Sequence, residues 1–290
     1  MLYHIGHSTN YTYTQPVFLK PHTLRLRPRC DSWQKLYSFA LTVEPEPVQV
    51  SQFTDLDGNA IAQIWFTGIT EHLKIQVTTE VETYRTNPFD YLLEPWATQL
   101  PLDYATSVLN QLQPYRQSYE MGADGAIAQL AQELYQNVQG ETVPFLGALN
   151  QHLYETCKQI IRETGDPWPA GVTLRQKQGS CRDVAVLFIE ICRAVGLAAR
   201  FVSGYQEGDL DAENLDLHAW AEVYLPGAGW RGYDPIQGLV VADRHVALVA
   251  SPLPQYTTPV VGNFAPVQPS LESGKVAQSQ MDVHLSINRI

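Results

Sequence analysis

The chain has 290 residues, which is long for one compact domain of ordinary size and suits two domains, each with a buried core. Its formal net charge is −11, and only 17% of its residues are charged. This balance argues against nucleic acids and membranes as partners, because both need a basic surface. The start of the chain lacks the basic and apolar segments of a signal peptide. We therefore expect a cytoplasmic protein.

Residues 1–95 are predicted to form an antiparallel, sandwich-like β domain. His4 and His7 are a weak candidate metal pair, expected at the exposed start of this domain. The segment 55–59 is interpreted as a hairpin turn with Gly58 at positive φ, rather than as a calcium loop. Alternating apolar and polar residues predict strands over 23–29, 37–43, 49–54, 61–66 and 73–83.

Proline dipeptides between residues 87 and 101 mark the connection to a second domain, residues 96–290. Helical periodicity predicts one helix from Asp124 and another over 145–164, with Cys157 on the apolar face of the second. The C-terminal strands are assigned to this second domain. Strands are expected over 239–249 and 281–287, and a long loop is expected between them, over 251–269.

A third helix is predicted to begin at Cys181 and to end near Val195, because a Gly-Ser pair precedes it, a glycine follows it and apolar residues recur on one face. The free backbone N–H groups at a helix start stabilise anions, and the thiolate is the reactive form of cysteine. Cys181 is therefore a candidate nucleophile, against the alternative of a small buried hydrophobe. Cys192, about three turns further on, is interpreted as core, and Asp183 is expected to stabilise the helix start.

A hairpin is predicted downstream, with His218 at its first residue and Asp234 near its last. A cysteine nucleophile needs a base and a carboxylate that orients the base, and these two residues supply them. Two registers are possible. Pairing of Leu225 with Trp230 turns Asp234 away from His218, whereas pairing of Tyr224 with Trp230 places Asp234 diagonal to His218 and within reach. The candidate site requires the second register.

Several residues compete for these roles. Glu222 lies on the same strand face as His218 and is a rival carboxylate, and His245 is a rival base. Trp220 and Trp230 are interpreted as packing residues, with a place beside the site as the alternative. The first oxyanion donor is expected to be the backbone N–H of Cys181, and the second stays open among Trp168, Gln176 and Gln178.

Four sequence blocks carry a resemblance to a known family. They are GSCRD at 179–183, RFVSGY at 200–205, HAWAEVY at 218–224 and GWRGYDP at 229–235. In this order and spacing they resemble the transglutaminase-like superfamily, which includes bacterial cysteine proteases. The resemblance is close over 143–250 and looser over the N-terminal β domain. It implies an α+β fold with a papain-like core, the nucleophile at a helix N-terminus packed on an antiparallel sheet, and a catalytic triad of Cys181, His218 and Asp234.

The triad implies cysteine-dependent attack on peptide or glutamine-type amides, through a thioester acyl-enzyme, with a peptide or protein as substrate. We expect hydrolysis rather than transfer to an amine. The alternatives are a transglutaminase, an acyltransferase with a thioester donor, and a non-catalytic binding or scaffold protein on the same fold. No cofactor or metal is expected, because the cysteines lack zinc-ligand spacing and there is no His-Glu-x-x-His motif. The oligomeric state is not indicated.

Overall fold

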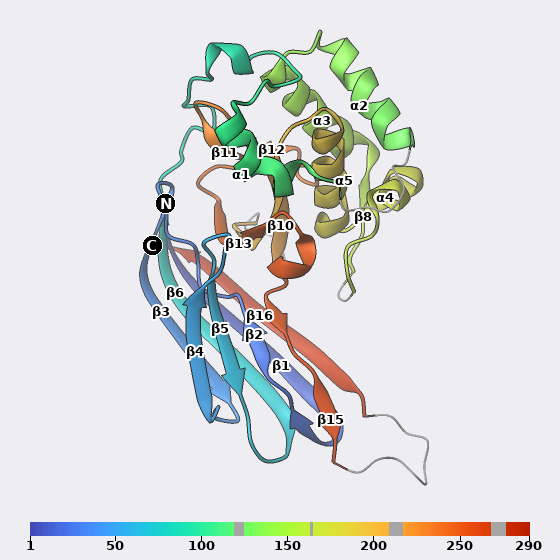
Figure 1. Ribbon diagram of the computed structural model, residues 1–290. Helices are drawn as coiled ribbons and strands as arrows, with labels where there is room; N and C mark the ends of the chain where they lie inside the picture. The colour runs from blue at the N-terminus through green and yellow to red at the C-terminus, as the bar shows by residue number, and fades with distance from the viewer. Residues whose placement is uncertain (119–124, 163–164, 209–216, 268–276) are drawn as a thin grey trace.

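The computed structural model describes residues 1–118, 125–162, 165–208, 217–267 and 277–290. It is a mixed α and β structure with a long antiparallel β-sandwich and a second sheet covered by helices (Figure 1). Both chain ends lie at the junction between these two parts. No helix in the described ranges has the length and apolar character needed to cross a bilayer.

The sandwich consists of two sheets that bury apolar side chains between them. One sheet has the order β15-β1-β6-β3, with β16 also paired to β1, and the other has the order β14-β2-β5-β4. The strands are β1 (Leu2–Leu19), β2 (His22–Leu24), β3 (Gln34–Glu44), β4 (Gln49–Thr54), β5 (Ala60–Trp65), β6 (Thr70–Thr83), β14 (Val260–Val261), β15 (Phe264–Pro266) and β16 (Ser279–Arg289). The predicted turn at 55–59 joins β4 to β5, and Gly58 has a φ of +77°.

Strand β1 lies outside the predicted strands. Its inward positions alternate as a strand should, but His7 and Thr9 occupy two of them, so the apolar pattern is interrupted. The expectation that His7 lies on an exposed start of the domain is therefore wrong: His7 is 3% exposed. Its imidazole is bonded to the Tyr205 hydroxyl and to Thr9 Oγ1, which satisfies both ring nitrogens.

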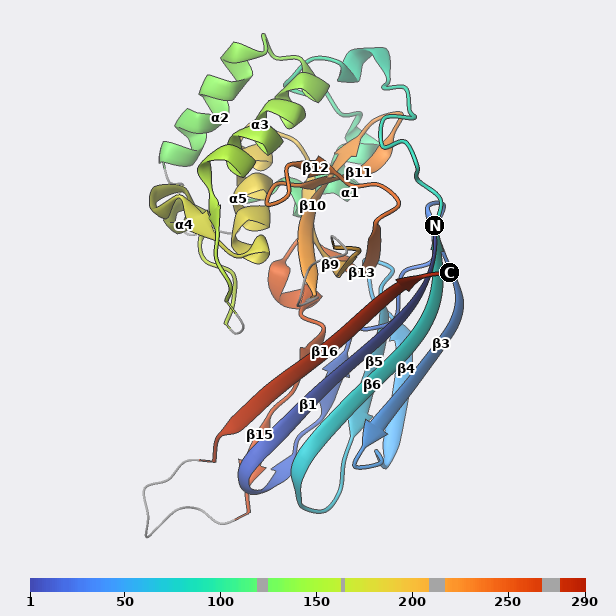
Figure 2. The same cartoon turned by 180° about the vertical axis from the view of Figure 1, so that it is seen from behind.

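The assignment of the C-terminal strands to the second domain is also wrong. β16 pairs with β1 from Tyr3↔Arg289 to Tyr13↔Ser279, β15 pairs with the end of β1, and β14 pairs with β2. Both views show β16 beside β1 (Figure 2). These pairings cover an edge of β1 that would otherwise expose unpaired backbone groups. Alternation predicts that such strands exist but does not indicate which strand they join.

The second sheet has the order β12-β11-β10-β9-β13. Its strands are β9 (Ala199–Gln206), β10 (His218–Leu225), β11 (Gly229–Asp234), β12 (Leu239–Val240) and β13 (His245–Ser251). The expected strand over 239–249 is thus two strands. The expected loop 251–269 includes β14, β15 and the 3-10 helix η2 (Pro254–Thr257) within its described part.

The helices pack on this sheet around α5 (Cys181–Ala194). The bounds of α5 agree with the helix predicted to begin at Cys181 and to end near Val195. The others are η1 (Pro95–Ala97), α1 (Thr106–Arg116), α2 (Gly125–Asn137), α3 (Thr142–Thr156) and α4 (Ala170–Gln176); α1 and α4 were not predicted, and Asp124 lies outside the described residues. Helix α3 ends before the predicted residue 164, because β7 (Lys158–Gln159) pairs in parallel with β8 (Gln178–Gly179) just before Cys181.

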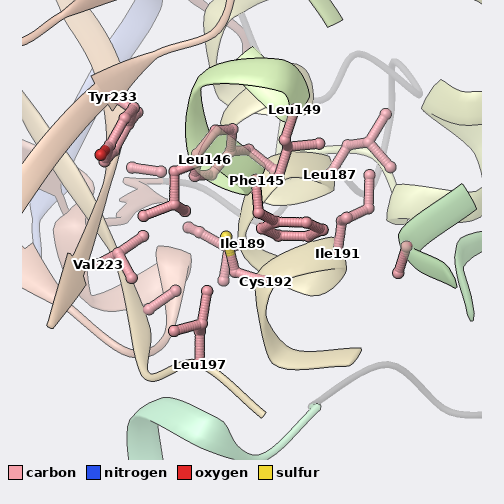
Figure 3. Packing of buried hydrophobic residues seen from close by; sticks show 14 of the residues in the cluster. Phe145, Leu146, Leu149, Leu187, Ile189, Ile191, Cys192, Leu197, Val223 and Tyr233 are labelled. Atoms are coloured by element: carbon pink, nitrogen blue, oxygen red, sulfur yellow. The ribbon is translucent and has the colours of Figure 1, made fainter. Parts of the chain in front are cut away.

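The core of this part is formed mainly by α3, α5 and the inner face of the sheet. Phe145 and Leu149 of α3 lie against Leu187 and Ile191 of α5 (Figure 3). Cys192 is fully buried in this cluster, and Cys157 is 7% exposed, so both predictions of core cysteines are confirmed. The packing fixes the axis of α5, and with it the position of Cys181.

Strand β13 joins the second sheet to the sandwich. The side-chain amide of Gln34 accepts from Ala247 N–H and donates to Ala247 C=O, both at 2.8 Å. The amide of Asn59 does the same at Ala250, at 2.9 and 2.8 Å. Two side chains of the sandwich therefore satisfy backbone groups that an edge strand leaves unpaired. The position of β13 depends on both parts of the chain.

Candidate active site

Cys181 is half-buried and is the first residue of α5. The preceding residue, Ser180, is the N-cap, in extended conformation. Asp183 accepts from Ser180 N–H at 2.7 Å and from Ser180 Oγ at 2.8 Å. The thiol thus lies where the helix presents free N–H groups and the positive end of its dipole.

Asp183 is fully buried and stabilises the helix start, as predicted. Besides Ser180, it accepts from the backbone N–H of Trp168 at 2.7 Å and forms an ion pair with Arg162 at 2.5 Å. Burial alone would raise the pKa of Asp183, but these hydrogen bonds lower it below its ordinary value. The carboxylate is thereby committed to holding the segment around Cys181 and is not free for substrate.

The hairpin has the register that the candidate site requires. Tyr224 pairs with Trp230, and Ala221 pairs with Tyr233, so Asp234 lies at the level of Trp220. His218 Nε2 is 2.6 Å from Asp234 Oδ2. The His218 side chain is 10% exposed and that of Asp234 is 0% exposed. Since a carboxylate only accepts, Nε2 carries the proton of this bond.

His218 connects Asp234 to Cys181. The Cys181 side chain lies close enough to His218 to raise its pKa, and because Nε2 is bonded to Asp234, Nδ1 is the ring nitrogen available to the thiol. Burial alone would lower the pKa of His218, but the charge of Asp234, the hydrogen bond to it and the nearby Cys181 side chain raise that pKa well above its ordinary value. Burial likewise would raise the pKa of Asp234, and the bonds from His218 and His245 lower it. The structure thus brings the three predicted residues together and favours an imidazolium beside the sulfur.

The rival residues have other partners. Glu222 forms an ion pair with Arg200 at 2.7 Å, and the Arg200 guanidinium lies over the Trp230 ring. His245 Nε2 is 3.1 Å from Asp234 Oδ2. It therefore contacts the carboxylate, which sequence reasoning missed, because the contact depends on the pairing of β13 with β9.

Two of the three candidates for the second oxyanion donor have other partners. The backbone N–H of Trp168 is bonded to Asp183, and Gln178 donates to the Gln176 side chain at 3.5 Å. Trp220 is 1% exposed and packs with Val202, Val241 and Ala250, as expected of a core residue, although it also lies beside the histidines.

One group of described side chains has the composition of a metal site. Ligand atoms of His218, Asp234 and His245 lie within 4.8 Å of one another. Both imidazoles, however, donate to the same carboxylate oxygen, so hydrogen bonds account for the close approach. We assign the cluster as a hydrogen-bonded set.

Comparison with known proteins identifies the family. Residues 3–82 match the bacterial transglutaminase-like N-terminal region, and residues 128–235 match the transglutaminase-like superfamily. The chain belongs to the transglutaminase-like superfamily. The second match includes all three residues of the candidate site.

Individual proteins are similar to the chain over different shares of its length. The structure of a candidate cysteine protease from Cytophaga hutchinsonii is 19% identical, with a TM-score of 0.71 over 100% of this chain and 91% of that one, which shows a shared fold. The uncharacterized protein Rv2569c of Mycobacterium tuberculosis is 27% identical over 270 residues, covering 85% of this chain and 82% of the relative. A protein-glutamine gamma-glutamyltransferase of Pseudomonas aeruginosa is 36% identical over 66 residues, 20% of this chain and 10% of that protein.

Proposed function

We propose that the protein is a cysteine hydrolase that cleaves peptide or glutamine-type amides through an acyl-enzyme on Cys181. The observation that carries this proposal is the hydrogen bond from His218 to buried Asp234, together with a thiol on the first turn of α5 that lies close enough to raise the pKa of His218. Nucleophilic catalysis by cysteine needs a base next to the sulfur and a group that orients the base. A scaffold protein has no physical need for these three side chains to converge.

In the proposed reaction, the Cys181 thiolate attacks the amide carbonyl, and the Cys181 backbone N–H donates to the oxyanion. The His218 imidazolium then gives its proton to the departing amine. The amine leaves, and the acyl group remains on sulfur as a thioester. Neutral His218 next removes a proton from water, which attacks the thioester and releases the acid. Asp234 stays ionised throughout and stabilises the imidazolium.

Transfer of the acyl group to an amine is the second candidate. It shares the first half of the reaction, and it is favoured by the resemblance of one segment to a protein-glutamine gamma-glutamyltransferase. In that case an amine takes the place of water and the product is a substituted amide. We place hydrolysis first because transfer needs an acceptor tunnel that excludes water, and none of the residues that the structure describes can be assigned to one.

An activated acyl ester tests the proposal. Mixed with the protein, it should add one acyl mass to the intact chain, and Cys181→Ala should abolish the adduct while Cys30→Ala, which removes an exposed cysteine, should retain it. The adduct should decay in buffer, and an added primary amine should not speed the decay. Faster decay with formation of the substituted amide identifies a transferase. Absence of the adduct in the unmodified chain contradicts the enzyme proposal and favours a scaffold.

We also propose a reducing compartment, the cytoplasm, as the location. The support is that all four cysteines are free, and a catalytic thiol persists where glutathione keeps thiols reduced. The protein recovered from its host under alkylating conditions should carry four blocked thiols. A disulfide in that material contradicts the proposed location.

A further inference from the structure

A second imidazole shares the carboxylate of the candidate site. His245 Nε2 and His218 Nε2 approach the same oxygen, Asp234 Oδ2, at 3.1 and 2.6 Å. Among the described residues, the other oxygen, Oδ1, accepts one weak bond, from Gln237 N–H at 3.3 Å. With side chains 2% and 0% exposed, His245 and Asp234 meet in a nearly dry environment. The orientation of this carboxylate is therefore set mainly by two histidines.

The protonation of His245 follows from its partners. A carboxylate only accepts, so His245 Nε2 must carry a proton. Its Nδ1 is buried and has no hydrogen-bond partner among the described residues. The charged and titratable groups that act on His245 are Asp234, His218 and the neighbouring Arg244, and burial lowers the pKa of His245. His245 is thus a neutral donor, which orients Asp234 without adding a second positive charge beside His218.

The fold brings His245 to this place with little freedom. Its ring packs edge-on against Trp220, with centroids 5.3 Å apart. The strand that carries it, β13, pairs with β9, where Gly204 lies between Ala247 and His218. A Cβ on Gly204 would come within 2.2 Å of Val246 O and 2.6 Å of the Trp220 ring. The absence of a side chain there is what permits this close approach.

We propose that His245 is a positioning residue, which holds Asp234 so that its Oδ2 accepts from His218 Nε2 and leaves His218 Nδ1 to Cys181. This inference rests on the proposed function of Cys181. It also gives the sandwich a role in the site: Gln34 and Asn59 hold the backbone of β13, and β13 carries His245. The N-terminal β domain acts on the reaction through this strand.

Two substitutions separate the loss of the His245 N–H donor from a change in the size of its side chain. His245→Met keeps an apolar side chain of similar reach and removes the donor, whereas His245→Gln keeps a neutral N–H at the position of Nε2. We expect alkylation of Cys181 at pH 6 to fall on the order of tenfold to a hundredfold in His245→Met, the cost of a reacting group misplaced by about an ångström. His245→Gln should stay near the parent rate and keep the shape of its pH profile. Equal rates in parent and His245→Met overturn the inference, as does a His245→Gln variant as slow as His245→Met.

Nitrogen NMR of histidine-labelled protein gives a readout that does not depend on reactivity. In the parent, both His218 and His245 should be protonated at Nε2, with a low-field Nε2–H signal for His218. That signal should broaden or disappear in His245→Met and persist in His245→Gln, at unchanged far-UV circular dichroism. An unchanged His218 signal in His245→Met contradicts the positioning role even if the enzyme is active. A parent chain with the expected signals and an unreactive Cys181 contradicts the proposed function instead.

Discussion

Acid should weaken the junction between the sandwich and the second sheet through His7. This residue of β1 is bonded to Tyr205 of β9 at 2.9 Å and to Thr9 at 3.0 Å. Burial lowers the pKa of His7 from 6.5 to about 4. Because the folded state resists protonation, the stabilisation is complete above pH 6.5 and is lost as the pH falls toward 4.

The size of the effect follows from that shift. At 1.36 kcal/mol per pKa unit, protonation of His7 should lower the free energy of unfolding by about 2 kcal/mol at pH 5 and about 3 kcal/mol at pH 4, relative to pH 8. The variant His7→Phe removes the titrating group. Between pH 8 and pH 4, its free energy of unfolding should therefore fall by about 3 kcal/mol less than that of the parent. At pH 8 it should be less stable than the parent by about 1–3 kcal/mol, because Tyr205 and Thr9 lose a buried partner.

Urea unfolding followed by tryptophan fluorescence, repeated between pH 4 and pH 8, measures both quantities. The difference between the two chains is the relevant value, since burial lowers the pKa of His22 and His245 as well. Free energies of unfolding that fall in parallel with pH in parent and variant would refute the reasoning. That result would mean that His7 is protonated in the folded state at little cost.

Two further substitutions test the position of β13. Gln34→Met should lower the free energy of unfolding by about 2 kcal/mol in urea, because Ala247 N–H loses its hydrogen bond to the Gln34 side chain while Ala247 C=O keeps a bond from Arg29 N–H. Gly204→Ala should destabilise by roughly 3 kcal/mol or more, since its Cβ would overlap backbone rather than a movable side chain; Gly147→Ala in α3, which meets nothing within 4 Å, is the control and should be neutral or stabilising in the same assay. Unchanged midpoints in either test variant would contradict the account of this strand.

The part of the site predicted from sequence rests on local signals. The start of α5 is specified by its own N-cap and first turn, and the hairpin from His218 to Asp234 by one turn between two alternating segments. The register was reduced to two choices because a slip of one residue moves Asp234 to the other face of the sheet. The structure has the register that brings Asp234 to His218.

What sequence did not predict depends on contacts distant along the chain. β16 joins β1, with Tyr3 opposite Arg289, and alternation contains no information about that partner. Strand β1 escaped prediction because buried His7 and Thr9 satisfy their polar groups on each other and on Tyr205. His245 reaches Asp234 only because β13 crosses to the far side of β9. Such partners become visible once the order of strands is known.

The pH dependence of alkylation at Cys181 tests the central claim most directly. Iodoacetamide should label Cys181 rapidly at pH 6, well below the pH of about 8.5 at which a free cysteine ionises, and mass spectrometry of peptides should follow each cysteine separately. Cys30, which is exposed, serves as the reference thiol on the same molecule. We predict that His218→Ala removes the reactivity of Cys181 at pH 6 and leaves that of Cys30 unchanged. If Cys181 and Cys30 follow the same pH profile in the parent chain, Cys181 is not activated by His218 and the account is wrong.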